Sequence, residues 1–196
     1  MDQLKIGILG LRRGMTHLRN FLALDQARVI GACDLLENNR QRAAKVIAEA
    51  PAKTGEIHDV TFVSDLDALL DLKPDAVVIA SHPSMHARHA CQILAAGCHV
   101  LSEVPGAYTP DEWLEIRAAV EQSGRHYMLA ENLSFMDFIR YWRRWFLQGR
   151  LGAVSMAETE YLHYLPETLT TPDGQTLTPS QARDQKSGDA VPNWRA

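Results

Sequence analysis

Residues 5–24 read KIGILGLRRGMTHLRNFLAL and decide the fold. The apolar run Lys5–Leu9 predicts a buried strand, and the spacing of Leu18, Phe21 and Leu22 predicts a helix after it. The turn between them contains Gly10, Leu11, Arg12, Arg13, Gly14 and Met15. A strand, a glycine-containing turn and a helix in this order are typical of the first unit of a doubly wound α/β domain.

The same alternation of short apolar runs and amphipathic segments continues to residue 132. We expect five further strands at 28–33, 60–63, 75–80, 99–103 and 126–130. The clearest is DAVVIA at 75–80, because an almost continuous Val/Ile run needs both of its faces covered. The pattern predicts an α/β domain at 1–132 with a doubly wound parallel sheet of the Rossmann type.

Helices are expected between these strands, and two of them carry start signals. They should pass through 40–47, 65–70, 85–96 and about 110–122. Ser64 has a hydroxyl that can cap the helix at 65–70. Thr109, Pro110 and Glu112 form a stronger signal, in which Thr109 and Glu112 make a capping box.

Beyond residue 132 the pattern changes. Apolar positions at 135, 139, 142 and 145–146 predict a long helix that ends near Gly149, and period-two spacing predicts a strand at 153–164. From Pro166 onward the chain is polar and turn-rich, which favours a loop or lid. We interpret 133–196 as the beginning of an α+β substrate or oligomerisation domain.

Composition excludes several classes of partner. The net charge is −4, with 46% hydrophobic and 22% charged residues, so neither nucleic acid nor an anionic membrane is an expected partner. Arg140, Arg143 and Arg144 suggest a nucleic-acid helix, but in an acidic chain a solvated helix edge is favoured. No run is apolar enough to span a bilayer, no signal peptide is evident, and three cysteines without a CxxC pair favour reduced thiols in a cytoplasmic protein.

The glycine turn suggests dinucleotide binding. The fingerprint G-x-G-x-x-G lets a pyrophosphate approach a helix N-terminus, but here the middle glycine is absent and the turn is one residue shorter. Asp34 ends the second expected strand 20 residues after Gly14, where a carboxylate can accept hydrogen bonds from both ribose hydroxyls of adenosine. The alternative is an α/β domain without a nucleotide, in which Asp34 is only a cap.

Several ordered elements resemble the glucose–fructose oxidoreductase and inositol dehydrogenase family. They are GILGLRRGMTHLRNFL, VIGACD, DAVVIASHPSMHARHACQILAAGCHVLSEVPGAYT and the strand ending in AEN. His17, Asp34, Ser81, His86 and the run Glu103-Val104-Pro105 occupy the places of family motifs. The resemblance implies NAD(P)-dependent hydride transfer on a sugar or polyol. It also implies a second domain built on an open antiparallel sheet, which supplies the substrate pocket and often a homo-oligomer interface.

The resemblance also implies a set of cofactor-binding residues. Besides the turn at 10–15, the set contains Asp34, Leu35, Ala80, Ser81, His82, Pro83, His86, Glu103, Val104, Pro105 and Asn132. Asp34 is followed by Leu35 and Leu36 rather than by a residue that would welcome a 2′-phosphate. We therefore expect NAD rather than NADP.

Two departures from the family pattern affect the chemistry. Val104 stands where the family has a lysine that assists proton movement at the reacting hydroxyl, and valine cannot transfer a proton. The chain as given also ends at Ala196, before most of the family's second domain. Candidate replacements for the missing acid/base are His163 and Tyr161, and then His86. His82, His86 and His89 also suggest a metal face, but no carboxylate or thiol joins them at comparable spacing, so no metal site is predicted.

Three functions follow from these residues. The first is an NAD-dependent oxidoreductase of a sugar-like or polyol-like substrate. The second is a non-catalytic NAD-binding sensor or assembly subunit, because Val104 removes the usual acid/base. The third is an enzyme that uses bound NAD transiently for elimination or glycoside cleavage, as some relatives of the family do.

Overall fold

The computed structural model describes residues 3–50, 59–160, 162, 169–170 and 176–178 of the 196-residue chain. The chain divides into two compact units, Met1–Asn132 and Leu133–Ala196. The first unit contains the sheet and its helices, and the second contains one longer helix and a short strand pair.

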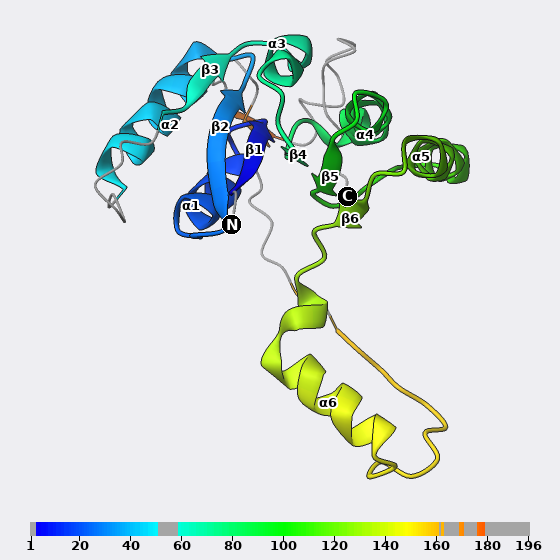
Figure 1. Ribbon diagram of the computed structural model, residues 1–196. Helices are drawn as coiled ribbons and strands as arrows, with labels where there is room; N and C mark the ends of the chain where they lie inside the picture. The colour runs from blue at the N-terminus through cyan, green and yellow to red at the C-terminus, as the bar shows by residue number, and fades with distance from the viewer. Residues whose placement is uncertain (1–2, 51–58, 161, 163–168, 171–175, 179–196) are drawn as a thin grey trace. The chain divides into compact units, whose positions relative to one another are not determined.

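A six-stranded parallel sheet forms the first unit (Figure 1). Its strands are β1 (Leu4–Leu9), β2 (Ala27–Cys33), β3 (Thr61–Val63), β4 (Ala76–Ile79), β5 (His99–Ser102) and β6 (Tyr127–Leu129). They lie in the order β3-β2-β1-β4-β5-β6, and each neighbouring pair is parallel. The order reverses between β1 and β4, which is the point at which open α/β sheets bind ligands. The predicted Rossmann sheet is confirmed.

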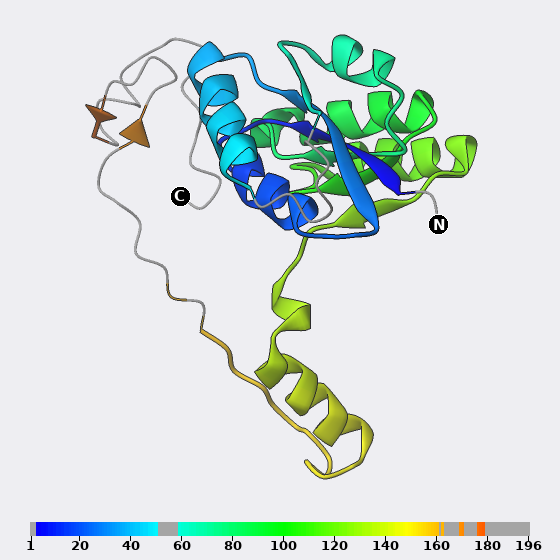
Figure 2. The same ribbon diagram turned by 60° about the vertical axis from the view of Figure 1, so that its left-hand side comes forward.

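Helices cover both faces of this sheet, as Figures 1 and 2 show. On one face lie α1 (Gly14–Leu22) and α2 (Glu37–Glu49), and on the other lie α3 (Leu66–Asp71), α4 (His86–Ala95) and α5 (Pro110–Ser123). A 3₁₀ turn, η1 (Pro83–Met85), precedes α4. In β4, Val77 packs into one core and Val78 into the other, which explains why the strand is apolar without alternation.

The two predicted helix starts have different outcomes. The capping box of Thr109 and Glu112 is present at the start of α5 and is confirmed. The expected Ser64 cap is wrong: the Asp65 carboxylate accepts from the Ala68 backbone N–H at 2.9 Å, while Ser64 only donates to Asp65. An Asp one position closer to the helix satisfies that N–H and also places a negative charge at the helix N-terminus.

In the second unit, most of the predicted long helix is confirmed. A 3₁₀ turn, η2 (Leu133–Phe135), comes first, and α6 (Asp137–Leu147) follows after an extended residue, Met136. The apolar stripe of α6 is exposed: Phe138, Trp142 and Trp145 retain 49%, 52% and 38% of their accessible surface. The described residues therefore leave this stripe open, and the predicted homo-oligomer through this unit stays a prediction.

The predicted strand at 153–164 is wrong over residues 153–160, which form no strand. Val154 and Met156 are exposed, and no described neighbour pairs with their backbone, so the alternating pattern has no sheet to join. The remaining predicted strand residues, apart from Leu162, lie outside the described residues. The tail at 166–196, predicted as a loop, contains a short antiparallel pair, β7 (Leu169–Thr170) with β8 (Thr176–Leu177). The sequence Pro-Asp-Gly at 172–174 is a turn signal that could have revealed this pair.

Two further findings concern the cysteines and the helix lengths. Cys33, Cys91 and Cys98 are free thiols. Burial and the neighbouring charges of Asp65 and Asp34 raise the pKa of Cys33 to about 12. Among the described helices, none combines the length and hydropathy needed to cross a membrane.

The turn after β1 supports a prediction about stability. Gly10 has φ of +92°, and a Cβ there would lie 2.4 Å from the Ala80 carbonyl oxygen. We expect Gly10→Ala to lower the free energy of unfolding by more than about 3 kcal/mol, because a steric clash adds to the cost of a left-handed backbone. Chemical denaturation measures this change.

Gly124→Ala is the matched control. Gly124 also has a positive φ, of 65°, but no atom lies within 4 Å of its added Cβ. The free energy of unfolding of Gly124→Ala should therefore fall only by the cost of a left-handed backbone, about 1–2 kcal/mol. Equal losses of unfolding free energy in the two variants would show that the close approach of Gly10 to Ala80 does not restrict position 10 to glycine.

Candidate functional site

The predicted cofactor residues gather at the carboxyl edge of the sheet. Backbone hydrogen bonds keep neighbouring strands aligned just beyond their last residues. These bonds are Gly10 N–H to Cys33 O at 2.8 Å, Ala80 N–H to Leu9 O at 2.7 Å, Glu103 N–H to Ile79 O at 2.8 Å and Ala130 N–H to Ser102 O at 2.7 Å. Four segments therefore begin at one edge of the sheet. In the order of their strands they are Asp34, the turn at 10–14, residues 80–83 and residues 103–105.

The glycine turn offers two kinds of surface. The side chains of Leu11 and Met15 are buried, with 1% and 6% of their surface exposed, and pack into the core beneath α1. Only their backbone can therefore face a ligand. Arg12 and Arg13 are exposed. Gly14 begins α1 and packs closely on β1, since a Cβ there would lie 3.0 Å from Ile8 Cγ2.

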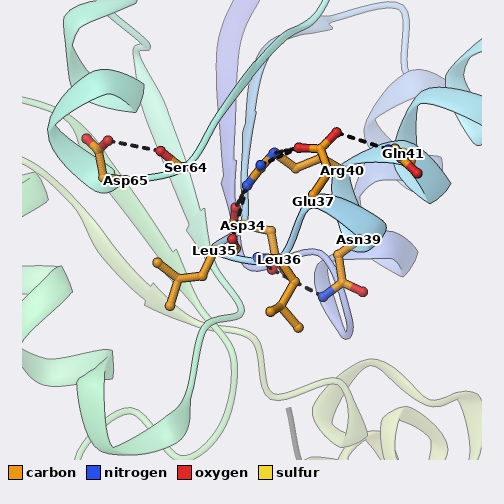
Figure 3. Close-up of polar contacts among 9 residues, drawn as sticks. All are labelled: Asp34, Leu35, Leu36, Glu37, Asn39, Arg40, Gln41, Ser64 and Asp65. Atoms are coloured by element: carbon orange, nitrogen blue, oxygen red, sulfur yellow. Dashed lines mark hydrogen bonds and ion pairs between the residues drawn. The ribbon is translucent and has the colours of Figure 1, made fainter. Parts of the chain in front are cut away.

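Asp34 connects the end of β2 to the glycine turn. Its Oδ2 accepts from the Leu11 backbone N–H at 2.7 Å. Its Oδ1 accepts from the Leu36 N–H at 2.9 Å and from Asn39 Nδ2 at 3.1 Å (Figure 3). A carboxylate has about four acceptor positions. Three are filled, so Oδ2 keeps one position for a further donor such as a ribose hydroxyl.

Arg40 and Asn39 of α2 are site residues that sequence reasoning missed. Arg40 donates to the carbonyl oxygens of Asp34 and Leu35 and pairs with Glu37 (Figure 3). Hydrogen bonds from Arg40 and Gln41 lower the pKa of the exposed Glu37. The available signal was position: Asn39 and Arg40 follow Asp34 within two turns of a helix that starts at the same edge.

His86 is buried, contrary to the open position expected of a catalytic group. Only 1% of its surface is exposed, and its Nδ1 and Nε2 contact the carbonyl oxygens of Pro105 at 2.8 Å and Ser81 at 3.1 Å. A carbonyl oxygen only accepts, and the His86 ring places one nitrogen against each of the two carbonyl oxygens. His86 thus joins the segments after β4 and β5. This placement makes the side chain a link between the two segments, and its predicted roles in catalysis and cofactor contact stay predictions.

His82 and His89, whose spacing with His86 suggested a metal face, have separate partners. His82 Nδ1 contacts the Ser84 hydroxyl at 2.7 Å, and His89 Nδ1 contacts the Ser81 hydroxyl at 2.9 Å. Burial and then the charge of His86 lower the pKa of both rings. His82 Nε2 is buried without a hydrogen-bond partner in the described part of the chain. No group of three metal-ligating side chains lies together among the described residues.

Glu103 forms a buried ionic network with the first turn and α1. Its Oε1 accepts from Arg13 Nε and His17 Nε2, both at 2.8 Å, and only 7% of its surface is exposed. Burial raises its pKa, but the hydrogen bonds from His17 and Arg13 outweigh burial and hold the pKa below the ordinary 4.5. Glu103 is thus an ionised carboxylate that ties β5 to the glycine turn. The lining role predicted for Glu103 remains untested.

The remaining predicted residues divide into those at the edge and those outside the described part. Val104 and Pro105 are half-buried after Glu103, and Asn132 is exposed after β6. Tyr161 and His163, the first candidates for the catalytic group, lie outside the described residues. Their roles stay predictions.

The edge fits a dinucleotide. A tight glycine turn begins a helix, an anchored carboxylate with a free acceptor position stands beside it, and an arginine lies in the turn. The glycine turn at a helix start and the carboxylate are the groups that bind a pyrophosphate and ribose hydroxyls in Rossmann domains. An NAD molecule would supply a hydride acceptor or donor at this edge.

The Glu103 network predicts a dependence of stability on pH. A folded-state pKa below 4.5 means that the contribution of Glu103 to stability is present above pH 4.5 and is lost as the pH falls through the folded-state pKa. The unfolding free energy of the wild type should therefore exceed that of Glu103→Gln above this pH, and the difference should vanish in acid. Denaturant titrations over a pH series measure both.

Glu121→Gln is the control for this experiment. Its pair with Arg117 on α5 is exposed, so its removal should change the unfolding free energy by less than about 1 kcal/mol. A gap between wild type and Glu103→Gln that widens in acid would contradict the assignment of an ionised, stabilising Glu103.

Comparison with known proteins supplies the family. Residues 4–131 match the Gfo/Idh/MocA family, an oxidoreductase family with an NAD-binding Rossmann fold. A similar curated protein is the glycosyl hydrolase family 109 protein 2 of Akkermansia muciniphila, 27% identical over 200 residues, or 98% of this chain and 41% of that protein. The chain thus spans about two fifths of the length of this relative.

Two solved structures are similar in fold. The scyllo-inositol dehydrogenase of Lactobacillus casei, solved with NAD(H) and scyllo-inositol, is 26% identical with a TM-score of 0.67 over 77% of this chain and 43% of that one. The WlbA dehydrogenase of Bordetella pertussis, in complex with NADH and UDP-GlcNAcA, is 21% identical with a TM-score of 0.67, over 77% of this chain and 41% of that one. The second likeness concerns the fold alone. Because the family match covers most of the chain and the resemblance seen in the sequence motifs agrees with it, the protein belongs to the Gfo/Idh/MocA oxidoreductase family with an NAD-binding Rossmann fold.

Proposed function

We propose that this chain binds NAD across the carboxyl edge of the sheet and serves hydride transfer with a sugar-like or polyol-like substrate. The observation that carries the proposal is the Asp34 carboxylate, fixed by the Leu11 N–H of the glycine turn at 2.7 Å. This bond supports the proposal because it holds a carboxylate beside the glycine turn, as binding of a ribose next to a pyrophosphate requires. The scyllo-inositol dehydrogenase with bound NAD(H) supports the substrate class.

The environment of Asp34 favours NAD over NADP. The ionised carboxylate repels a 2′-phosphate, and a nearby cation would be needed to offset this repulsion. Arg40 is the nearest candidate, but its guanidinium is already engaged with Glu37 and with the carbonyl oxygens of Asp34 and Leu35. Leu35 adds an apolar side chain, 84% exposed, that suits an adenine rather than a phosphate.

The test is a titration of both cofactors by calorimetry. We expect the wild type to bind NAD at least about tenfold more tightly than NADP, and Asp34→Ala to lose most of this preference, because both the ribose acceptor and the repulsive charge are removed. Asp111→Asn, which removes a charge from the exposed first turn of α5, is the control and should keep the preference. Equal affinity of the wild type for NADP would overturn the cofactor assignment.

A second candidate is a reaction in which the cofactor is regenerated within each turnover, leading to elimination or glycoside cleavage. Two observations favour it. Val104 replaces the lysine that assists net dehydrogenation in the family pattern, and the curated relatives include several named glycosyl hydrolase family 109 proteins. In either reaction, Val104 and Pro105 offer an apolar, half-buried surface without a proton donor.

The proton transfer must then come from another residue, and His163 and Tyr161 remain the candidates. In a form of the protein that shows activity, His163→Ala and Tyr161→Phe should each lower kcat by about 10²–10⁴, because general acid–base help has that value. NAD affinity should stay within about threefold, since these residues are assigned to the substrate side. Val104→Lys is the reciprocal variant and should raise net dehydrogenation.

The product distinguishes the two candidate reactions. Net NADH from a panel of sugars and polyols supports the dehydrogenase, whereas release of an aglycone without added NAD supports the regenerated cofactor. Full activity in both His163→Ala and Tyr161→Phe would show that the acid/base lies elsewhere. NAD binding without either product, in every form of the protein, would favour the non-catalytic sensor.

A further inference from the structure

The first turn lacks a feature that usually brings backbone amides to a pyrophosphate. The middle glycine of the fingerprint is absent, and the N–H of Leu11 is already bound to the Asp34 carboxylate. The Leu11 side chain is buried in the core beneath α1, which fixes that peptide in place. A diphosphate at this turn therefore has fewer backbone N–H groups to bind, and a side chain can supply a further donor.

Arg13 has the geometry for that task. Its Nε donates to Glu103 at 2.8 Å, while 64% of its side chain remains exposed. An arginine has five N–H donors, and the bond to Glu103 uses one of them. The bond to Glu103 fixes Nε, and the planar guanidinium of this largely exposed side chain can offer its remaining donors to two phosphate oxygens.

Glu103 and His17 hold the arginine rather than the ligand. Glu103 is almost fully buried and shares one oxygen between Arg13 Nε and His17 Nε2, so its charge is balanced before any ligand binds. Fixing a long side chain in advance reduces the entropy that binding would otherwise cost. An exposed arginine without such an anchor would contribute less.

We propose that Arg13 is the diphosphate clamp of this protein and takes the place of the missing glycine, with Glu103 and His17 as its positioning residues. This inference rests on the proposed binding of NAD at the same edge. It differs from that proposal in assigning recognition of the diphosphate to an anchored side chain instead of to the turn's backbone.

The experiment compares three ligands, NAD, ADP-ribose and adenosine, by calorimetry on the full chain. Arg13→Met keeps the apolar stem and should weaken NAD and ADP-ribose by about tenfold to a hundredfold, the usual effect of losing hydrogen bonds to a charged group. Adenosine, which lacks the diphosphate, should bind within about twofold of the wild type. Raising the salt concentration should weaken NAD binding less in Arg13→Met than in the wild type, because one screened charge pair is gone.

Two further variants distinguish the role of Arg13 as a clamp from the role of Glu103 as its positioning residue and from a general effect of positive charge. Arg19→Met removes an equal charge from an exposed position of α1 and should leave all three affinities within about twofold. Glu103→Gln should weaken NAD by a smaller factor, and in the Arg13→Met background it should have no further effect on NAD, which a purely structural role of Glu103 would not produce.

The outcomes are distinct. Loss of diphosphate affinity in Arg13→Met with adenosine unchanged supports the clamp. Wild-type NAD affinity in Arg13→Met, or an equal loss in Arg19→Met, overturns it. Failure of the wild type to bind NAD overturns the proposed function itself, and unchanged adenosine binding verifies that Arg13→Met is folded.

Discussion

The contact between the first turn and the end of β4 is the constraint on which the edge of this protein depends. Gly10 has no side chain and a positive φ, and a Cβ would strike the carbonyl of Ala80. Because the two central strands can meet so closely, Ala80 continues the backbone bonding of β1 and Leu11 turns inward to the core. The backbone N–H of Leu11 then donates to the Asp34 carboxylate. The position of the Asp34 carboxylate, the proposed ribose acceptor, thus depends on the absence of one side chain.

Two anchored carboxylates extend this constraint across the sheet. Asp34 binds the turn from β2, and Glu103 binds it from β5 through Arg13 and His17. The buried His86 adds a third link, between the segments that follow β4 and β5. Four strands are therefore tied together by side chains at the edge where the backbone ladder ends. Such an edge is rigid before a ligand arrives, which favours binding because little conformational entropy is lost.

The sequence was sufficient for the sheet but not for the details of the site. Strands such as 75–80 are apolar without interruption, and glycine and capping residues mark the helix limits, so order and type could be predicted. The contacts of His86 could not be predicted. The spacing in the sequence puts a histidine after β4 but does not tell whether its ring faces the ligand or the backbone. The Asp65 cap was missed because a shift of one residue decides which side chain caps α3. Arg40 was missed because two of its partners are backbone carbonyl oxygens, which no side-chain pattern marks. The predicted strand failed over residues 153–160 because a strand pattern forms a strand only beside another strand.

The central claim is that the dinucleotide lies across the carboxyl edge with its adenosine ribose on Asp34. A crystal structure of the protein with NAD tests this most directly. We predict a ribose hydroxyl within hydrogen-bonding distance of Asp34 Oδ2, which is the acceptor position left open beside the Leu11 N–H. The diphosphate should lie over residues 10–14, and the nicotinamide should face the segment after β4. NAD bound at another surface, or at this edge with its ribose away from Asp34, would contradict the account.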